Sequence, residues 1–226
     1  MSELIQMFQD GDYLSLMIVI MSKAFVVFCC LPIHELAHAI VANKCGDDTA
    51  RLQGRLTLNP FAHLDFVGTV MIFFFGIGYA KPVPVNPARL KHPRKDMALI
   101  SVAGPISNFL MSFISIFICY ALFAFGGENA AVSAVASFFY YAAMVNVSLA
   151  VFNLLPVPPL DGAKFFSAVL PDKIYFKLMK YDRYIMIGLL ILLFTGVLDT
   201  PLSIITNFFI KIISFIPKLI FGVTVY

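Results

Sequence analysis

Charged side chains are scarce in this sequence. Asp, Glu, Lys and Arg make up 13% of its 226 residues, whereas hydrophobic residues make up 60%. Soluble domains carry about 25% charged and about 45–50% apolar residues. A soluble fold of this size cannot bury so much apolar surface, and the mean hydropathy of +0.89 agrees. The composition therefore excludes an ordinary soluble domain and predicts a polytopic membrane protein.

The sequence also lacks the features of several other protein classes. Its four cysteines include no C-x-x-C pair and no disulfide framework, so we expect thiols buried among helices. The net charge is only +3, and no basic helix or interleaving of basic and aromatic residues is present, so no nucleic-acid partner is expected. The N-terminus carries Glu3, Asp10 and Asp12 and lacks the basic region of a secretory signal peptide.

Long apolar runs are the main feature that is present. A bilayer-spanning helix needs about 20 predominantly apolar residues. Five runs approach or exceed that length, namely Tyr13–Val41, Ala98–Phe125, Ala130–Leu155, Tyr184–Leu198 and Pro201–Gly222. The last run carries Lys211, Lys218 and the internal Pro217, and it either spans the bilayer or lies in its interface. The pattern predicts an all-α polytopic membrane protein with five or six transmembrane helices.

A sixth apolar run, Phe66–Ala80, is shorter and contains three glycines. It leads into Lys81–Val85, where alternating prolines exclude a helix and favour extended backbone. Both flanking segments, Lys44–Asp65 and Lys81–Lys95, are rich in Lys and Arg, so the positive-inside rule places both in the cytoplasm. We therefore predict a re-entrant hairpin that ends in a short β element near the cytoplasmic face. The same rule places the N-terminus outside.

The first apolar run contains the pattern H-E-x-x-H, from His34 to His38. Residues four apart on a helix share one face, so both imidazoles can bind one metal ion, and Glu35 between them suits a general base. An ionisable group deep in a membrane helix costs about 2.5–3.5 kcal/mol, and a bound metal compensates that cost. The alternative, a solvated helix end, is disfavoured because the apolar run continues to Val41.

Two histidines leave a catalytic zinc site short of one protein ligand, because such sites use three ligands and a water. Cys30 shares the histidine face, but it lies about 12 Å along the helix from His38, too far for one ion. The acidic candidates are Asp65, Asp161 and Asp199. Asp161 is favoured because it follows a proline-rich break after an apolar helix, and the flexible Gly162 after it suits a returning ligand. A solvated aspartate in a cytoplasmic loop is the alternative.

Several further motifs accompany these residues. They are Leu58–Asp65 (L-N-P-F-A-H-L-D), Gly78–Pro87 (G-Y-A-K-P-V-P-V-N-P), Gly104–Asn108 (G-P-I-S-N) and Asn153–Gly162 (N-L-L-P-V-P-P-L-D-G). Together with the H-E-x-x-H pattern they resemble the site-2 protease family of intramembrane zinc proteases, in its small bacterial subgroup without a PDZ domain. The resemblance covers about residues 34–162.

The resemblance implies roles for individual residues. Asp161 would complete, with His34 and His38, a site for one zinc ion per chain. Asn153 would lie near the ion, where its amide polarises the scissile carbonyl or holds its oxyanion. A helix C-terminal cap is an equal alternative for Asn153.

Two further assignments concern the substrate. The stretch Pro82-Val83-Pro84-Val85 would pair with an unwound substrate by β-augmentation, with a packing element as the alternative. Asn108 is a substrate-contact candidate, with an inter-helix hydrogen bond as the alternative.

The resemblance thus implies an intramembrane zinc metalloprotease that hydrolyses peptide bonds in or near transmembrane segments of membrane proteins. We expect one membrane-embedded domain over 1–226, with a catalytic core at about 13–170 and C-terminal helices at about 184–222. The expected setting is the bacterial plasma membrane, with the lipid bilayer and a transmembrane protein substrate as partners. The alternatives are a catalytically silent membrane zinc protein and a metal transporter. A transporter would spread its ligands along a pore, and a silent relative would lack Glu35 or a ligand.

Overall fold

The computed structural model describes residues 2–75, 77, 80–127, 129–166, 168 and 180–223. Every regular element within these ranges is helical. The elements are α1 (Ser2–Gln9), α2 (Tyr13–Phe25), η1 (Val26–Cys30), α3 (Leu31–Lys44), α4 (Thr49–Leu52), η2 (Pro60–Ala62), α5 (Phe66–Phe75), η3 (Pro87–Arg89), α6 (Pro93–Phe125), α7 (Ala130–Asn153), α8 (Asp161–Phe166), α10 (Asp182–Phe194) and α11 (Asp199–Phe221). The predicted all-α class is thereby confirmed.

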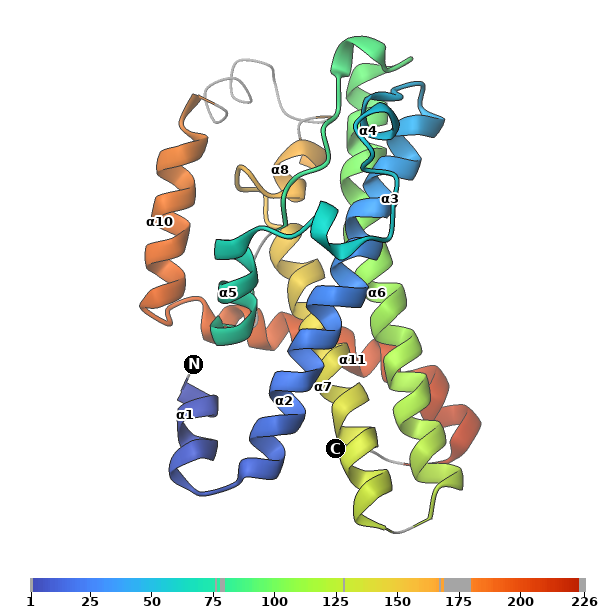
Figure 1. Ribbon diagram of the computed structural model, residues 1–226, viewed down its shortest axis with the longest axis vertical. Helices are drawn as coiled ribbons and strands as arrows, with labels where there is room; N and C mark the ends of the chain where they lie inside the picture. Colours follow the sequence, from blue (N-terminus) through green and yellow to red (C-terminus); the bar gives the residue numbers. More distant parts are fainter. Residues whose placement is uncertain are drawn as a thin grey trace.

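Four helical stretches in the described part of the chain are long and apolar enough to cross a membrane. They are Tyr13–Lys44, Pro93–Phe125, Ala130–Asn153 and Asp199–Phe221. Helix α10 has 13 residues, which at about 1.5 Å per residue is shorter than a hydrocarbon core of about 30 Å. The predicted count of five or six spans is therefore not confirmed. Helix α11 runs across α6 and α7 instead of along them (Figure 1).

The first span is one continuous helix made of α2, η1 and α3. Its middle part, η1, is a π-helix, after which the amide of Leu31 donates to the carbonyl of Val26, five residues back. Pro32 follows and has no N–H to donate, so the wider turn lies where the regular hydrogen-bond ladder is interrupted. The π-turn also changes which face the next residues present, and His34 and His38 follow in α3, both buried.

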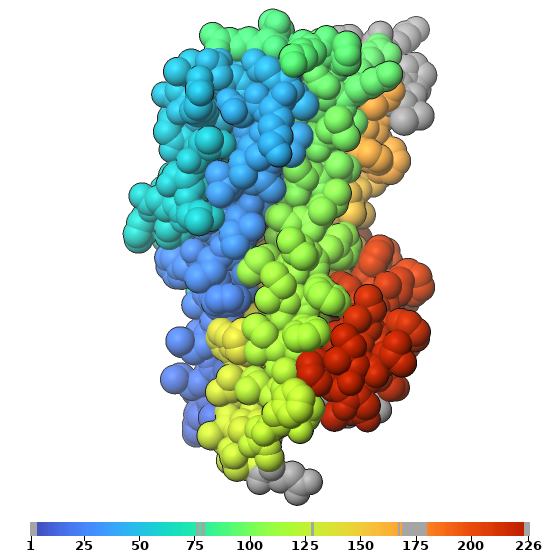
Figure 2. Space-filling view, turned by 90° about the vertical axis from the view of Figure 1, so that its right-hand side faces the viewer, coloured from blue at the N-terminus to red at the C-terminus, as the bar shows by residue number. Residues whose placement is uncertain are grey.

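The site is held by the packing of α3, α6 and α7. Helix α6 packs most extensively against α7 and then against α3, and α3 and α6 lie side by side along one face of the molecule (Figure 2). Leu149 on α7 and Ile72 on α5 are almost completely buried in the cluster that surrounds η1. Close packing of this kind fixes the rotation of each helix and hence the direction of its polar side chains.

The segments before and after α5 are joined by a backbone hydrogen bond. The amide of Lys81 donates to the carbonyl of His63 over 2.7 Å, so the chain on either side of α5 meets again. Inside the first span, Lys23 Nζ donates to the carbonyl of Phe73 near the end of α5, over 2.7 Å. A lysine at this position satisfies a free carbonyl of the last helical turn. The two segments that flank α5 thus lie together, and a re-entrant course of this part of the chain remains a prediction.

The predicted β element is not confirmed. The described residues contain no strand, and Lys81–Asn86 has extended coil without regular pairing. Residues 51–58, whose alternating leucines would suit a partner strand, begin in helix α4. The physical reason lies in the sequence, because Pro82 and Pro84 have no N–H and cannot donate to a ladder. Side chains hold both ends of this segment, as described below.

Successive helix ends lie at opposite ends of the molecule, in the order that the charge pattern predicts. The end of α3, the start of α6 and α8 lie at one end of the molecule, whereas α1 and the turn after α6 lie at the other (Figure 1). The basic segments Lys44–Asp65 and Lys81–Lys95 therefore share one side of the bundle. This arrangement agrees with the predicted topology, and which side faces the cytoplasm remains a prediction.

Candidate metal centre

His34 and His38 lie one turn apart on α3 and direct their Nε2 atoms to one point. The two Nε2 atoms are 3.1 Å apart, and Asp161 Oδ2 lies 3.4 Å from His34 Nε2 and 3.1 Å from His38 Nε2. Zinc–ligand bonds of about 2.0–2.1 Å at tetrahedral angles place neighbouring ligand atoms about 3.3 Å apart. The three donor atoms therefore have the spacing that one tetrahedral zinc ion requires. Within the described ranges this is the one group of three such side chains.

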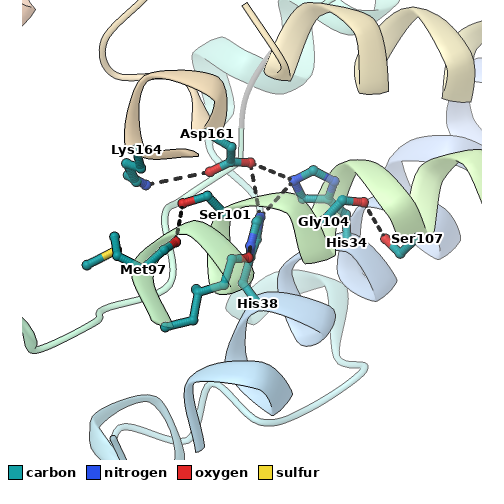
Figure 3. A network of polar contacts seen from close by, with 9 residues as sticks. His34, His38, Met97, Ser101, Gly104, Ser107, Asp161 and Lys164 are labelled. Atoms are coloured by element: carbon teal, nitrogen blue, oxygen red, sulfur yellow. Dashed lines mark hydrogen bonds and ion pairs between the residues drawn. The ribbon is translucent and has the colours of Figure 1, made fainter. Parts of the chain in front are cut away.

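Asp161 reaches the histidines from α8, 123 residues further along the chain than His38. Figure 3 shows its carboxylate facing both imidazoles, with Lys164 on the other side. Lys164 Nζ lies 3.6 Å from Oδ1, so the carboxylate directs one oxygen to the histidines and the other to a cation. Burial alone raises the pKa of Asp161, but His38 and His34 hold it well below its ordinary value. A metal ligand of this kind must bind as the carboxylate, which is the form that these neighbours favour.

The outer surroundings of the histidines differ. His38 Nδ1 lies 2.6 Å from the carbonyl oxygen of Ile100 on α6, a contact that fixes the ring and leaves Nε2 for a metal. His34 Nδ1 is buried and has no hydrogen-bond partner in the described part of the molecule. The ring of His34 is instead held by packing against α6.

Glycine allows two very close approaches at this centre. A Cβ added at Gly104 on α6 would lie 2.3 Å from His38 Nε2 and 2.5 Å from His34 Nε2. A Cβ added at Gly162 would lie 2.3 Å from the carbonyl oxygens of Leu154 and Leu155. Gly162 was expected to supply flexibility, but it has no left-handed φ, and the structure gives it a different role. It lets α8 pack on the turn after α7 and so brings Asp161 to the histidines.

The other ligand candidates do not join the centre. Asp65 Oδ1 accepts the amide of Gly68 over 2.9 Å at the start of α5. Asp199 begins α11 and is absent from the group of candidate metal ligands. Cys30, the last residue of η1, accepts a hydrogen bond at Sγ from Asn146 Nδ2 on α7 over 3.4 Å. Of the candidates considered, Asp161 is the one that the fold places beside both histidines.

A cavity of about 470 Å³ opens beside the centre. Glu35 and Asn153 line it, both less than a tenth exposed. Pro82, Val83 and Val85 form part of its wall, and most of the remaining lining is apolar. Asn153 is the last residue of α7, where the helix ends and its side chain borders the cavity. The cavity thus combines a carboxylate, an amide and a candidate metal site within apolar walls, as ligand sites commonly do.

Two of the predicted substrate residues lie elsewhere. Pro84 is half-buried, and it does not appear among the described residues that line the cavity. Asn108 is fully buried on α6, one turn beyond Gly104, and likewise does not line the cavity. Both polar atoms of its side-chain amide lack a hydrogen-bond partner in the described part of the chain. The structure therefore offers no direct route from Asn108 to a substrate in the cavity.

The sequence did not single out three residues that matter here. Lys164 follows Asp161 by three residues, a spacing that on a helix places both on one face and would have revealed it. Gly104 was noted within a motif, but no local pattern shows that it touches the histidines. Arg55 belongs to the basic segment Lys44–Asp65 that was used only to predict topology. It is buried and donates from Nη2 to the carbonyl of Lys81 over 2.5 Å.

The site combines two histidines and an aspartate at zinc spacing with a neighbouring glutamate and an apolar cavity. Because it lies within a bundle of membrane-length helices, these features define the class of the protein as an intramembrane zinc protease. Comparison with known sequences names the family. Residues 22–126 and 120–195 match the model of peptidase family M50, and the chain belongs to this family. The predicted site-2 protease family and zinc cofactor are thereby confirmed. No PDZ domain is present in the residues that the structure describes.

Individual relatives agree. The chain is 44% identical over 164 residues to YwhC of Bacillus subtilis, whose name describes a zinc metalloprotease; the match covers 72% of this chain and 75% of YwhC. Rip2 of Mycobacterium tuberculosis, named likewise, is 26% identical over 197 residues, which is 84% of this chain and 72% of Rip2. A protein of Methanocaldococcus jannaschii with the same kind of name is 28% identical over 138 residues, covering 58% of this chain and 61% of that protein. No solved structure matches the chain.

Proposed function

We propose that this protease cuts transmembrane protein substrates within the plasma membrane of a bacterium, with its N-terminus outside the cell. The observation that carries the proposal is the triangle of His34, His38 and Asp161 beside Glu35 in a largely apolar cavity. We assign the zinc to these three ligands. Bound zinc would act as a Lewis acid that activates water and polarises the scissile carbonyl.

The residues around the cavity carry the other steps. Glu35 takes a proton from the attacking water and delivers it to the leaving amine. Asn153 borders the same cavity, and its amide is a donor for the oxygen that gains charge at the scissile carbonyl. The apolar walls exclude bulk water, which strengthens these electrostatic contacts. A metal transporter is not favoured, because the three donor atoms converge on one point.

The extended segment Pro82–Val85 is the proposed substrate contact. Val83 and Val85 line the cavity, and neither amide takes part in a backbone hydrogen bond with any described residue. An unwound substrate can therefore add along this edge and accept from these amides, as in β-augmentation. Local unwinding of the substrate is required, because a helix buries its peptide groups in its own hydrogen bonds.

The charge pattern and the fold support the orientation. The basic segments Lys44–Asp65 and Lys81–Lys95 share the end of the bundle near the metal site, and the chain on either side of α5 meets there. We therefore place this end in the cytoplasm and treat α5 as re-entrant. A catalytic core at about 13–170 contains every residue assigned above, and the C-terminal helices complete the single domain.

Exchange of Glu35 for Gln tests the proposal. Glu35→Gln keeps the size of the side chain but cannot accept a proton, so we expect full zinc content and near-complete loss of cleavage. Zinc is measured by mass spectrometry of the purified protein, and cleavage by the accumulation of uncut membrane proteins in cells. Substantial cleavage by Glu35→Gln would refute the general-base role. A control variant, Glu3→Gln, changes an acidic residue far from the site in the sequence and should cleave normally.

A further inference from the structure

Arg55 is a buried arginine that the proposed catalytic groups do not explain. It lies in the connection between α4 and η2, only 8% exposed. Arg51, four residues earlier at the end of α4, is 59% exposed at its side chain and pairs with Asp48 at 3.8 Å. Buried arginines are uncommon unless they are paired or hydrogen-bonded, because a buried charge loses its hydration. The contrast between two nearby arginines indicates a specific role for the buried one.

The guanidinium of Arg55 acts on the segment that lines the cavity. Its Nη2 donates to the carbonyl oxygen of Lys81 over 2.5 Å, and the amide of Lys81 donates to the carbonyl of His63 over 2.7 Å. Both backbone groups of Lys81 are therefore held. At the other end, the amide of Asn86 donates to Asp47 Oδ2 over 2.6 Å. The residues between these two anchors, Pro82–Val85, are the proposed substrate edge.

The guanidinium of Arg55 also has an electrostatic interaction with the Glu35 carboxylate. Burial lowers the pKa of Arg55, and the charge of the Glu35 carboxylate raises it in opposition. Its Nε–H has no hydrogen-bond partner in the part of the chain that the structure describes. One charged side chain thus holds the backbone that would present the substrate and interacts electrostatically with Glu35.

We propose that Arg55 is a positioning residue of this protease, which fixes the Lys81 carbonyl and so directs the open edge of Val83 and Val85 into the cavity beside Glu35. This inference rests on the proposed function, because it presumes that a substrate adds along that edge. Arg55 itself does not line the cavity among the described residues and acts from behind the segment. Its loss should weaken substrate capture more than the chemical step.

The experiment compares Arg55→Met, Arg55→Lys and the matched control Arg51→Met, each in the purified full-length protein. The probe is a dye-labelled single-span peptide of alternating Leu and Ala with a central Asn-Pro-Gly, which favours local unwinding. Binding is measured by fluorescence anisotropy in detergent, in a Glu35→Gln background that cannot cut the peptide. Zinc content of every variant is measured in parallel.

We expect Arg55→Met to weaken binding by roughly 10-fold or more, the effect typical of losing a hydrogen bond to a charged group. Arg55→Lys should recover part of the affinity, and Arg51→Met should bind as the parent does. Zinc content should stay unchanged in all of them. With Glu35 restored, Arg55→Met should raise KM for the same peptide far more than it lowers kcat, a split that general misfolding does not produce.

Each outcome separates the inference from the function on which it rests. Normal peptide binding by Arg55→Met, with binding by the parent intact, would overturn the role of Arg55 and leave the protease assignment in place. Loss of zinc in Arg55→Met would also overturn it, because the residue would then support the fold or the metal centre instead. Absence of peptide binding by the Glu35→Gln parent would refute the proposed substrate edge and this inference with it.

Discussion

Exchange of Gly104 for alanine should disrupt the metal centre through a single methyl group. The added Cβ would lie 2.3 Å from His38 Nε2 and 2.5 Å from His34 Nε2, where ordinary contacts need 3.4 Å or more. The imidazoles must therefore move by roughly 1 Å, whereas zinc–ligand distances tolerate only about 0.2 Å. Helix propensity acts in the opposite direction, because alanine in a helix is favoured over glycine by about 1 kcal/mol.

We expect the zinc affinity of Gly104→Ala to fall by about 10–100-fold or more, which corresponds to about 1.4–2.7 kcal/mol. Competition with a chelating dye measures the affinity, and thermal unfolding with and without zinc measures the stability. The zinc-free variant should be about as stable as zinc-free wild type or slightly more so, while the stabilisation that zinc adds should shrink.

Gly188→Ala in α10 is the matched control. A Cβ at Gly188 meets nothing within 4 Å, so this variant gains helix propensity without touching any ligand. It should bind zinc as wild type does. Wild-type zinc affinity in Gly104→Ala would refute the reasoning, because it would show that α6 moves away from the histidines without cost.

Three further predictions follow from particular contacts. Asp161→Ala should lose most of its zinc, whereas Asp65→Ala should keep it, and full zinc content in Asp161→Ala would move the third ligand elsewhere. Val83→Pro should abolish most cleavage with zinc content unchanged, whereas Val83→Ala should reduce cleavage only slightly, because only proline removes the free amide. Equal cleavage by Val83→Pro and wild type would show that the segment is a packing element. The pKa of Asp47 is raised by burial but lowered more by hydrogen bonds from Thr49 and the amide of Asn86, so its net shift is downward. A carboxyl group with a depressed pKa stabilises the fold above about pH 4, and this stabilisation is lost as the pH falls further. Asp47→Asn should therefore unfold at a lower temperature than wild type at pH 7. If the difference in unfolding temperature between the two proteins does not narrow in acid, this reasoning is contradicted.

Much of the secondary structure was predictable because its signals are local. The predicted run Ala130–Leu155 became α7 at Ala130–Asn153, and Pro201–Gly222 became α11 at Asp199–Phe221. Apolar length and the break at proline or glycine are properties of neighbouring residues, so the sequence carries them directly. The direction of α11 across the bundle was not predictable, since it depends on the surfaces of α6 and α7.

The extended segment shows where local patterns become insufficient. Alternating prolines correctly excluded a helix at Lys81–Val85, but they did not show what holds the segment. Its anchors are the side chains of Arg55 and Asp47, which lie 26 and 39 residues away from their backbone partners. From the sequence, the charge of Arg55 could be used only to predict membrane topology. Its burial could not be predicted, because burial of a side chain is decided by the fold around it.

The sequence by itself determined the membrane class and the pair of imidazoles on one helix face, because hydropathy and the i, i+4 spacing of His34 and His38 need no tertiary contact. It left three aspartates as possible third ligands, among which the proline-rich break before Asp161 and a family resemblance favoured Asp161. The tertiary structure decided the rest. It brings Asp161 to within 3.4 Å of both histidines across a separation of 123 residues from His38, and it seats Gly104 against their rings. Such contacts depend on the rotation of packed helices and on the course of the chain between them, which no local pattern encodes.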